Sequence, residues 1–277
     1  MRHMEEFNRW LQVNELDSRM KADLITAHGN DDEIQSRFGC DLAFGTAGLR
    51  GVMGAGTNRM NIYTVRRASK GFGNYIVSLG KEAMERGIII AYDCRNNGKS
   101  FAMETALTVA ALGVKVRLFD ALRPTPELSF AIRALNAIGG VNITASHNPK
   151  EYNGYKVYFE DGAQISGEQA DFILNEMQKV DPLNVETITE EETIENPYNL
   201  QKRHLPPCIN SLHAYQKTPL KDSFLAADCR WTSILLSFHL HPLHEHDDYR
   251  KAGSPLELQT HLDQVLVFPS HRPSARQ

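Results

Sequence analysis

The chain has 277 residues, of which 42% are hydrophobic and 23% charged, a composition typical of a globular protein with one or two packed cores. Its formal net charge of -4 and its lack of an apolar run of about 20 residues argue against nucleic acid and membranes as partners. The four cysteines form no CxxC pair, so neither zinc nor a disulfide framework is predicted, and without a secretory signal we expect a reducing, cytoplasmic setting.

The first 40 residues are predicted to form a helical region. In its first part Phe7, Leu11 and Leu16 stand among charged residues, as in an amphipathic helix. From residue 41 to about 185, short apolar runs alternate with segments of helical spacing. Strands are expected at 87–92, 114–119, 138–144 and 154–159, and helices at 65–79, 101–112, 126–135 and 167–180. This alternation predicts an α/β layered sandwich.

The character of the chain changes at about residue 186. Residues 186–200 include the acidic stretch ETITEEETIEN, which we interpret as a solvated linker or the start of a further domain. Residues 201–277 hold one glycine and eight of the 11 histidines, without sustained periodicity, so we expect an irregular tail outside the α/β fold. A histidine-rich cluster there is more often incidental than a transition-metal site. Its members are His239, His241, His244, His246 and Asp247.

A glycine-rich segment, FGTAGLRG at 44–51, is the first that could carry chemistry. Its three glycines permit tight turns and a close approach to a ligand, and Arg50 among them offers a fork of donors that suits phosphate. Taken alone, such a segment is more often only a turn. The next segment, GAGTNR at 54–59, lacks the last glycine of a dinucleotide fingerprint, so NAD is not predicted.

Residues 92–100, YDCRNNGKS, end like a phosphate-binding P-loop. Asp93 stands where that motif requires its first glycine, so nucleoside triphosphate binding is rejected. At the end of a predicted strand, Asp93 and Arg95 are expected to form a structural ion pair near the site.

A small polar loop, TASHNP at 144–149, follows a predicted strand, where α/β sheets tend to place ligands. Stiffened by Pro149, it presents Ser146 as a candidate nucleophile or phosphoryl carrier, although a lone loop serine is usually a turn residue. His147, as the immediate neighbour, is poorly placed to be its general base. Without a GxSxG elbow, serine hydrolysis is a weak alternative.

Together these segments resemble the α-D-phosphohexomutases, the phosphoglucomutase/phosphomannomutase family. The resemblance covers about residues 1–197, and one segment, GVMGAGTNRMN at 51–61, is similar to the phosphoglucomutase type. The motifs that carry it are FGTAGLRG (44–51), RPTPE (123–127), TASHNP (144–149) and YNGYK (152–156). It implies the first domain of that family, a three-layer α/β/α sandwich with a mixed sheet.

The resemblance also implies a reaction, the conversion of glucose 1-phosphate into glucose 6-phosphate. Ser146 would carry a phosphate in the resting enzyme, pass it to the hexose phosphate to form a bisphosphate, and take back the other phosphate. Arg50 would neutralise charge, Lys156 would exchange the sugar hydroxyl proton, and His147 would hold the loop. Substrate or phosphate would be bound by Thr46, Gly48, Asn148 and Asn153. The implied cofactors are Mg²⁺, held through the phosphate on Ser146, and glucose 1,6-bisphosphate as activator.

The magnesium loop of the family, of the type DGDxDR, is not found in this sequence, because Asp161-Gly162 is followed by Ala163. Two hypotheses therefore stay open. The chain is either a truncated mutase or a catalytically inactive fragment that binds a sugar phosphate or a partner protein. The sequence specifies neither the preferred sugar phosphate nor an oligomeric state.

Overall fold

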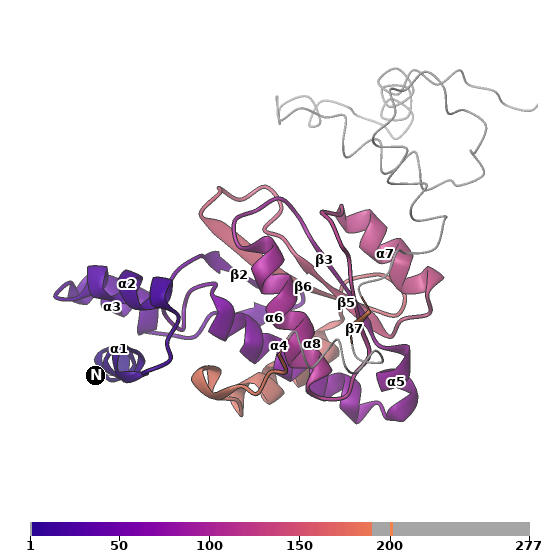
Figure 1. Ribbon diagram of the computed structural model, residues 1–277, viewed down its shortest axis with the longest axis horizontal. Coiled ribbons are helices and arrows are strands. Elements are labelled where there is room, and N and C mark those ends of the chain that lie inside the picture. The colour runs from indigo at the N-terminus through magenta and orange to yellow at the C-terminus, as the bar shows by residue number, and fades with distance from the viewer. Residues whose placement is uncertain (1, 190–199, 202–277) are drawn as a thin grey trace, which may run out of the picture. The chain divides into compact units, whose positions relative to one another are not determined.

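The computed structural model describes residues 2–189 and 200–201, which all belong to one unit of the chain (Figure 1). Apart from Gln201, the expected irregular tail and its histidine cluster lie outside the described residues. Among the residues described, no helix is long and apolar enough to cross a membrane.

Three helices form the N-terminal region, as predicted: α1 (Arg2–Gln12), α2 (Ser18–Ala27) and α3 (Asp31–Phe38). The side chains of Asp17 and Asn30 cap α2 and α3 by accepting hydrogen bonds from free backbone N–H groups. The helices enclose a small core in which Trp10 packs edge-on against Phe38 and against Tyr63 of α4 (Ile62–Ser78). Tyr63 thereby ties this region to the helices that follow.

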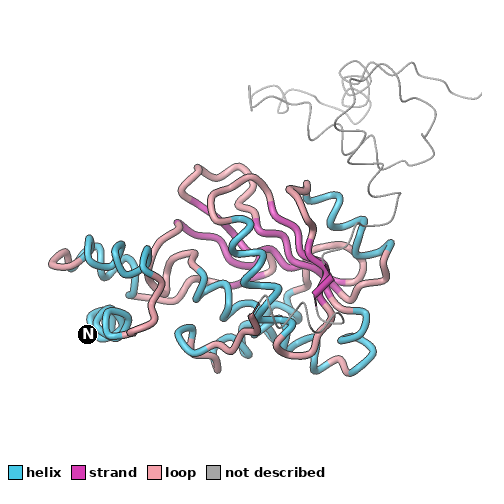
Figure 2. Tube along the Cα trace, viewed as in Figure 1, coloured by secondary structure: helices cyan, strands magenta, loops and turns pink. Residues whose placement is uncertain are grey.

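The strands form one mixed sheet in the order β1-β2-β6-β5-β3-β4-β7. The pairs β5–β3, β3–β4 and β4–β7 are parallel, and β1–β2, β2–β6 and β6–β5 are antiparallel. The strands lie side by side with helices packed around them (Figure 2). Their bounds are β1 Phe44–Gly45, β2 Gly48–Val52, β3 Ile88–Tyr92, β4 Val116–Leu118, β5 Gly139–Ile143, β6 Tyr152–Phe159 and β7 Leu200–Gln201.

Helices cover both faces of the sheet. A Cβ on Gly139 of β5 would meet Phe72 of α4, whereas a Cβ on the next residue, Gly140, would meet Ile132 of α7. Because successive residues of a strand point to opposite faces, α4 and α7 lie on opposite faces, and the expected three-layer α/β/α sandwich is confirmed. The helices are α4 Ile62–Ser78, α5 Lys81–Arg86, α6 Gly98–Ala110, α7 Thr125–Ala134, α8 Gly167–Gln178 and the 3₁₀ turn η1 Pro182–Asn184.

The four strands and four helices predicted between residues 41 and 185 are confirmed within a few residues at each end. Three features of residues 41–185 were missed. The short helix α5 and the 3₁₀ turn η1 were not expected. The segment at 44–51, interpreted as a turn, is a hairpin in which a two-residue turn joins β1 to β2. Glycine-rich strands carry little β propensity, so only pairing with the distant β6 identifies them.

The start of the acidic stretch is less solvated than expected. Ile188 is partly buried against the main core, and its backbone N–H donates to the carbonyl of Leu107 in α6 at 3.5 Å. Burial of the apolar Ile188 side chain stabilises the fold, so this one position packs on the core, and the expectation of a linker or the start of a further domain over 186–200 stays a prediction.

Candidate active site

The loops that follow β3 and β5 meet at one edge of the sheet. These strands are parallel neighbours in which Tyr92 pairs with Ile143, so the next residues along each chain segment are adjacent. The backbone N–H of Asp93 donates to the carbonyl of Ile143 at 3.2 Å and seals this junction. The TASHNP loop therefore lies at the carboxyl end of the parallel strands, where α/β sheets bind ligands.

Ser146 is exposed at this edge and has an unusual backbone. Its φ is +55°, in the left-handed region that costs a non-glycine residue about 1–2 kcal/mol. Its Oγ lies 3.3 Å from Nδ1 of His147, and its N–H donates to Oγ1 of Thr144 at 3.1 Å. His147 is thus within reach of the serine hydroxyl, which its position as next neighbour in the sequence had argued against.

Arg50 reaches the serine loop from β2. Its guanidinium donates from Nη1 to Oδ1 of Asn148 at 3.2 Å, across 98 positions of sequence. The side chain is exposed, and Arg50 pairs with Gly154 of β6 in the sheet. The contact leaves most of the guanidinium donors free for an anion beside Ser146.

Lys156 stands two residues beyond Gly154, so it points to the same face of the sheet as Arg50. It is partly buried, and this burial lowers the pKa of its ammonium group below the ordinary value. The nearby charge of Arg50 lowers the pKa further, whereas Asp93 raises it. A lysine with a lowered pKa exchanges a proton more readily near neutrality.

Asp93 and Arg95 form the expected ion pair, with 3.7 Å between Nε of Arg95 and Oδ2 of Asp93. The sequence did not predict a second set of contacts of Arg95, in which its guanidinium donates to backbone carbonyls of the serine loop. It also missed Thr144, whose hydroxyl donates to Asp93. The strand-end DxR spacing was the available signal for the ion pair, but it does not encode the carbonyl contacts.

Two of the predicted phosphate-binding residues, Gly48 and Asn153, are buried in the sheet. Asn153 is fully buried, and its amide donates to the carbonyl of Asn96 at 3.0 Å and accepts from the N–H of Gly154 at 2.8 Å. Gly48 is buried in the hairpin with φ +74°. Neither presents a polar side chain to solvent, and the expectation that they bind substrate or phosphate stays a prediction. Thr46 is exposed in the β1–β2 turn.

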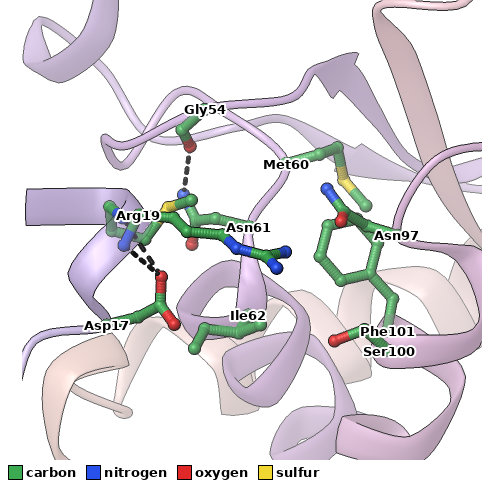
Figure 3. Close-up of a pocket in the computed structure, with 10 residues that line it drawn as sticks. Asp17, Arg19, Gly54, Met60, Asn61, Ile62, Asn97, Ser100 and Phe101 are labelled. Atoms are coloured by element: carbon green, nitrogen blue, oxygen red, sulfur yellow. Dashed lines mark hydrogen bonds between the residues drawn. The ribbon is translucent and has the colours of Figure 1, made fainter. Parts of the chain in front are cut away.

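A separate cavity of about 80 Å³ lies between the start of α2 and the start of α6 (Figure 3). Arg19 and Phe101 are on its wall, and Asn61 there donates to the carbonyl of Gly54 at 2.9 Å. None of the predicted site residues line it, so it adds nothing to the serine site.

The described residues do not fit a magnesium site by themselves. Within 2–189 and 200–201, no group of three or more His, Cys, Asp or Glu side chains could hold a metal ion. Beside the serine loop, Asp93 accepts from Thr144 and pairs with Arg95, so its oxygens are already engaged. A divalent ion takes six or more oxygen ligands, so it would need ligands besides the oxygens of Asp93.

Comparisons with known proteins point to one family. The model described as phosphoglucomutase/phosphomannomutase, alpha/beta/alpha domain I, matches residues 41–184. A phosphoglucomutase of Staphylococcus epidermidis is 45% identical over 159 residues, and a phosphopentomutase of Homo sapiens is 38% identical over 168, which is 57% and 58% of this chain. The chain spans 28% of the length of each relative. A solved structure of a phosphoglucomutase/phosphomannomutase family protein from Burkholderia thailandensis is 27% identical, with a TM-score of 0.42, and the match covers 49% of this chain and 30% of that one.

Proposed function

Because this chain belongs to the phosphoglucomutase/phosphomannomutase family, we propose that Ser146 is the phosphoryl carrier of a sugar-phosphate mutase. The observation that carries the proposal is the convergence of Arg50, Lys156 and the serine loop at one edge of the sheet. Phosphoryl transfer depends mainly on positioning and on neutralised charge, and this edge offers both.

The proposed reaction has two transfers. In the first, the bond between phosphorus and Oγ of phosphorylated Ser146 breaks while a hydroxyl oxygen of glucose 1-phosphate bonds to the phosphorus. The hydroxyl proton passes to Lys156 in its neutral form, and Oγ of Ser146 leaves as an alkoxide that takes up a proton from solvent to become a free hydroxyl. The resulting glucose 1,6-bisphosphate then returns its other phosphate to Ser146 by the same steps in reverse, leaving glucose 6-phosphate.

The residues around the serine have distinct parts in this proposal. Arg50 would stabilise the charge on the transferring group, held in place by Asn148. His147 would hydrogen-bond the serine oxygen at the 3.3 Å now seen between them. Thr46, exposed in its turn, would contact the substrate. Magnesium would bind through the phosphate of Ser146, but the described residues add no cluster to hold it, so no step is derived through the ion.

A second candidate is a non-catalytic module that binds sugar phosphate through Arg50 and the serine loop. The chain spans 28% of the length of each of the two relatives compared above, so the activity of a whole mutase is itself a proposal for this chain. The relative named phosphopentomutase also makes a pentose phosphate a candidate ligand beside the hexose phosphate.

Phosphate uptake separates the two candidates. The full chain is incubated with glucose 1,6-bisphosphate and Mg²⁺, and intact-mass analysis with peptide mapping is expected to locate one phosphate on Ser146. Ser146→Ala should take up none, whereas Ser78→Ala, a matched change of another exposed serine, should behave as the wild type. Binding of glucose 1-phosphate without any phosphorylation would favour the non-catalytic module. Turnover is then followed by a coupled assay for glucose 6-phosphate.

A further inference from the structure

Arg95 joins four backbone carbonyls, three in the TASHNP loop and one at Tyr152, the first residue of β6. Its Nη2 donates to the carbonyls of Ser146 and Asn148 at 2.7 and 2.6 Å. Its Nη1 donates to those of Pro149 and Tyr152 at 2.9 and 3.0 Å. One side chain from the loop after β3 thus spans the whole turn between β5 and β6.

These contacts leave Arg95 unable to bind a substrate phosphate. The two Nη atoms carry four N–H groups, and four carbonyls accept them. The remaining donor, on Nε, faces Asp93, and only 12% of the side chain is exposed. Arg95 therefore acts on the reaction through the loop and is not a catalytic residue.

The same network fixes Ser146 from its other side. Asp93 accepts the backbone N–H of Arg95 at 3.0 Å and the hydroxyl of Thr144, and Thr144 in turn accepts the N–H of Ser146 at 3.1 Å. The amide N–H of Ser146 is held by Thr144, and its carbonyl is held by Arg95. Both peptide planes that flank this serine are therefore anchored to the end of β3.

We propose that Arg95 is a positioning residue for phosphoryl transfer, holding Ser146 at its left-handed φ of +55° so that Oγ stays aimed at the substrate. Such a backbone conformation persists only when its surroundings enforce it. This inference rests on the proposed function. Lysine cannot replace Arg95, because one ammonium group cannot donate at once to the two carbonyls that Nη1 contacts and the two that Nη2 contacts.

The test compares Arg95→Lys with Arg86→Lys in the full chain. Arg86 is a matched control because it also donates to two backbone carbonyls, those of Asn136 and Ala137. It precedes β3, whereas Arg95 follows β3, so the two arginines lie at opposite ends of that strand. The rate of phosphate uptake by Ser146 is measured against the concentration of glucose 1,6-bisphosphate. Arg95→Lys is expected to lower the saturating rate about tenfold to a hundredfold with an unchanged half-saturating concentration, and Arg86→Lys to leave both unchanged.

Amide hydrogen exchange of peptides that span residues 144–152 measures how firmly the loop is held, and it does not depend on phosphoryl transfer. Exchange there is expected to rise in Arg95→Lys, while that of α4 and α8 stays as in the wild type and shows that the fold is kept. Thr144→Val, which removes the other anchor, should give the same pattern. Wild-type uptake rates in Arg95→Lys, a raised half-saturating concentration at an unchanged rate, or unchanged exchange would each overturn the positioning role. Absence of uptake in the wild type would overturn the proposed function itself.

Discussion

Replacement of Gly48 by alanine is expected to destabilise the fold strongly. A Cβ at this position would lie 1.8 Å from the backbone carbonyl oxygen of Tyr155, and φ is +74°. The left-handed backbone costs alanine about 1–2 kcal/mol. The overlap costs about 1–3 kcal/mol more, because the oxygen belongs to β6, which is paired on both sides and cannot withdraw.

Gly45, at the other side of the same turn, is the matched control. A Cβ there would meet no atom within 4 Å, and its φ is not in the left-handed region. Gly45→Ala should change the free energy of unfolding by less than about 0.5 kcal/mol. Gly48→Ala should lower it by about 2–5 kcal/mol, a large part of the 5–15 kcal/mol typical of a domain.

Urea unfolding followed by circular dichroism measures both variants. The comparison also decides between two roles for Gly48. If Gly48→Ala unfolds at the wild-type urea concentration but no longer takes up phosphate on Ser146, the glycine serves the ligand, and the steric argument is refuted. Equal destabilisation by the two alanines would refute it as well.

Three further predictions concern charged groups. Lys156→Met should lower phosphate uptake about 10²–10⁴-fold, and the wild-type rate should rise with pH through the lowered pKa of Lys156, a rise that the variant lacks. Arg50→Ala should reduce the uptake rate by about 10²-fold, while the control Arg86→Lys does not. Burial raises the pKa of Glu127 to about 7, although Arg123 opposes the rise. The folded state then keeps the proton that the unfolded state releases, so the free energy of unfolding should fall as the pH rises towards 7, and urea unfolding of Glu127→Gln should lack this fall.

Local sequence patterns were sufficient to predict an element when all its residues have the same burial. The run at 88–92 is apolar and every residue of it is buried in the sheet, so a buried strand was the natural prediction. Pro126 lies in the first turn of α7, where its missing N–H costs nothing. The hairpin at 44–52 was not predicted, because its glycine-rich sequence shows no alternation of apolar and polar residues.

The candidate site was predictable as a set of motifs but not as a set of contacts. Ser146, Arg50 and Lys156 were identified from their segments, and the structure brings these segments to one edge of the sheet. The motif did not indicate that the amide of Asn153 is buried and hydrogen-bonded to the backbone of Asn96 and Gly154, because these contacts depend on the tertiary fold.

By itself the sequence determined the alternation of strands and helices, the family, and the serine loop, since all three depend on residue identity over short stretches. Only the tertiary structure decided that Arg95 contacts the carbonyls of that loop and that Gly48 lies against the carbonyl of Tyr155. The physical reason is that both depend on backbone carbonyls of distant segments. Every residue carries the same carbonyl group, so sequence does not mark which one a side chain will meet, and only the pairing of β2, β6, β5 and β3 fixes it.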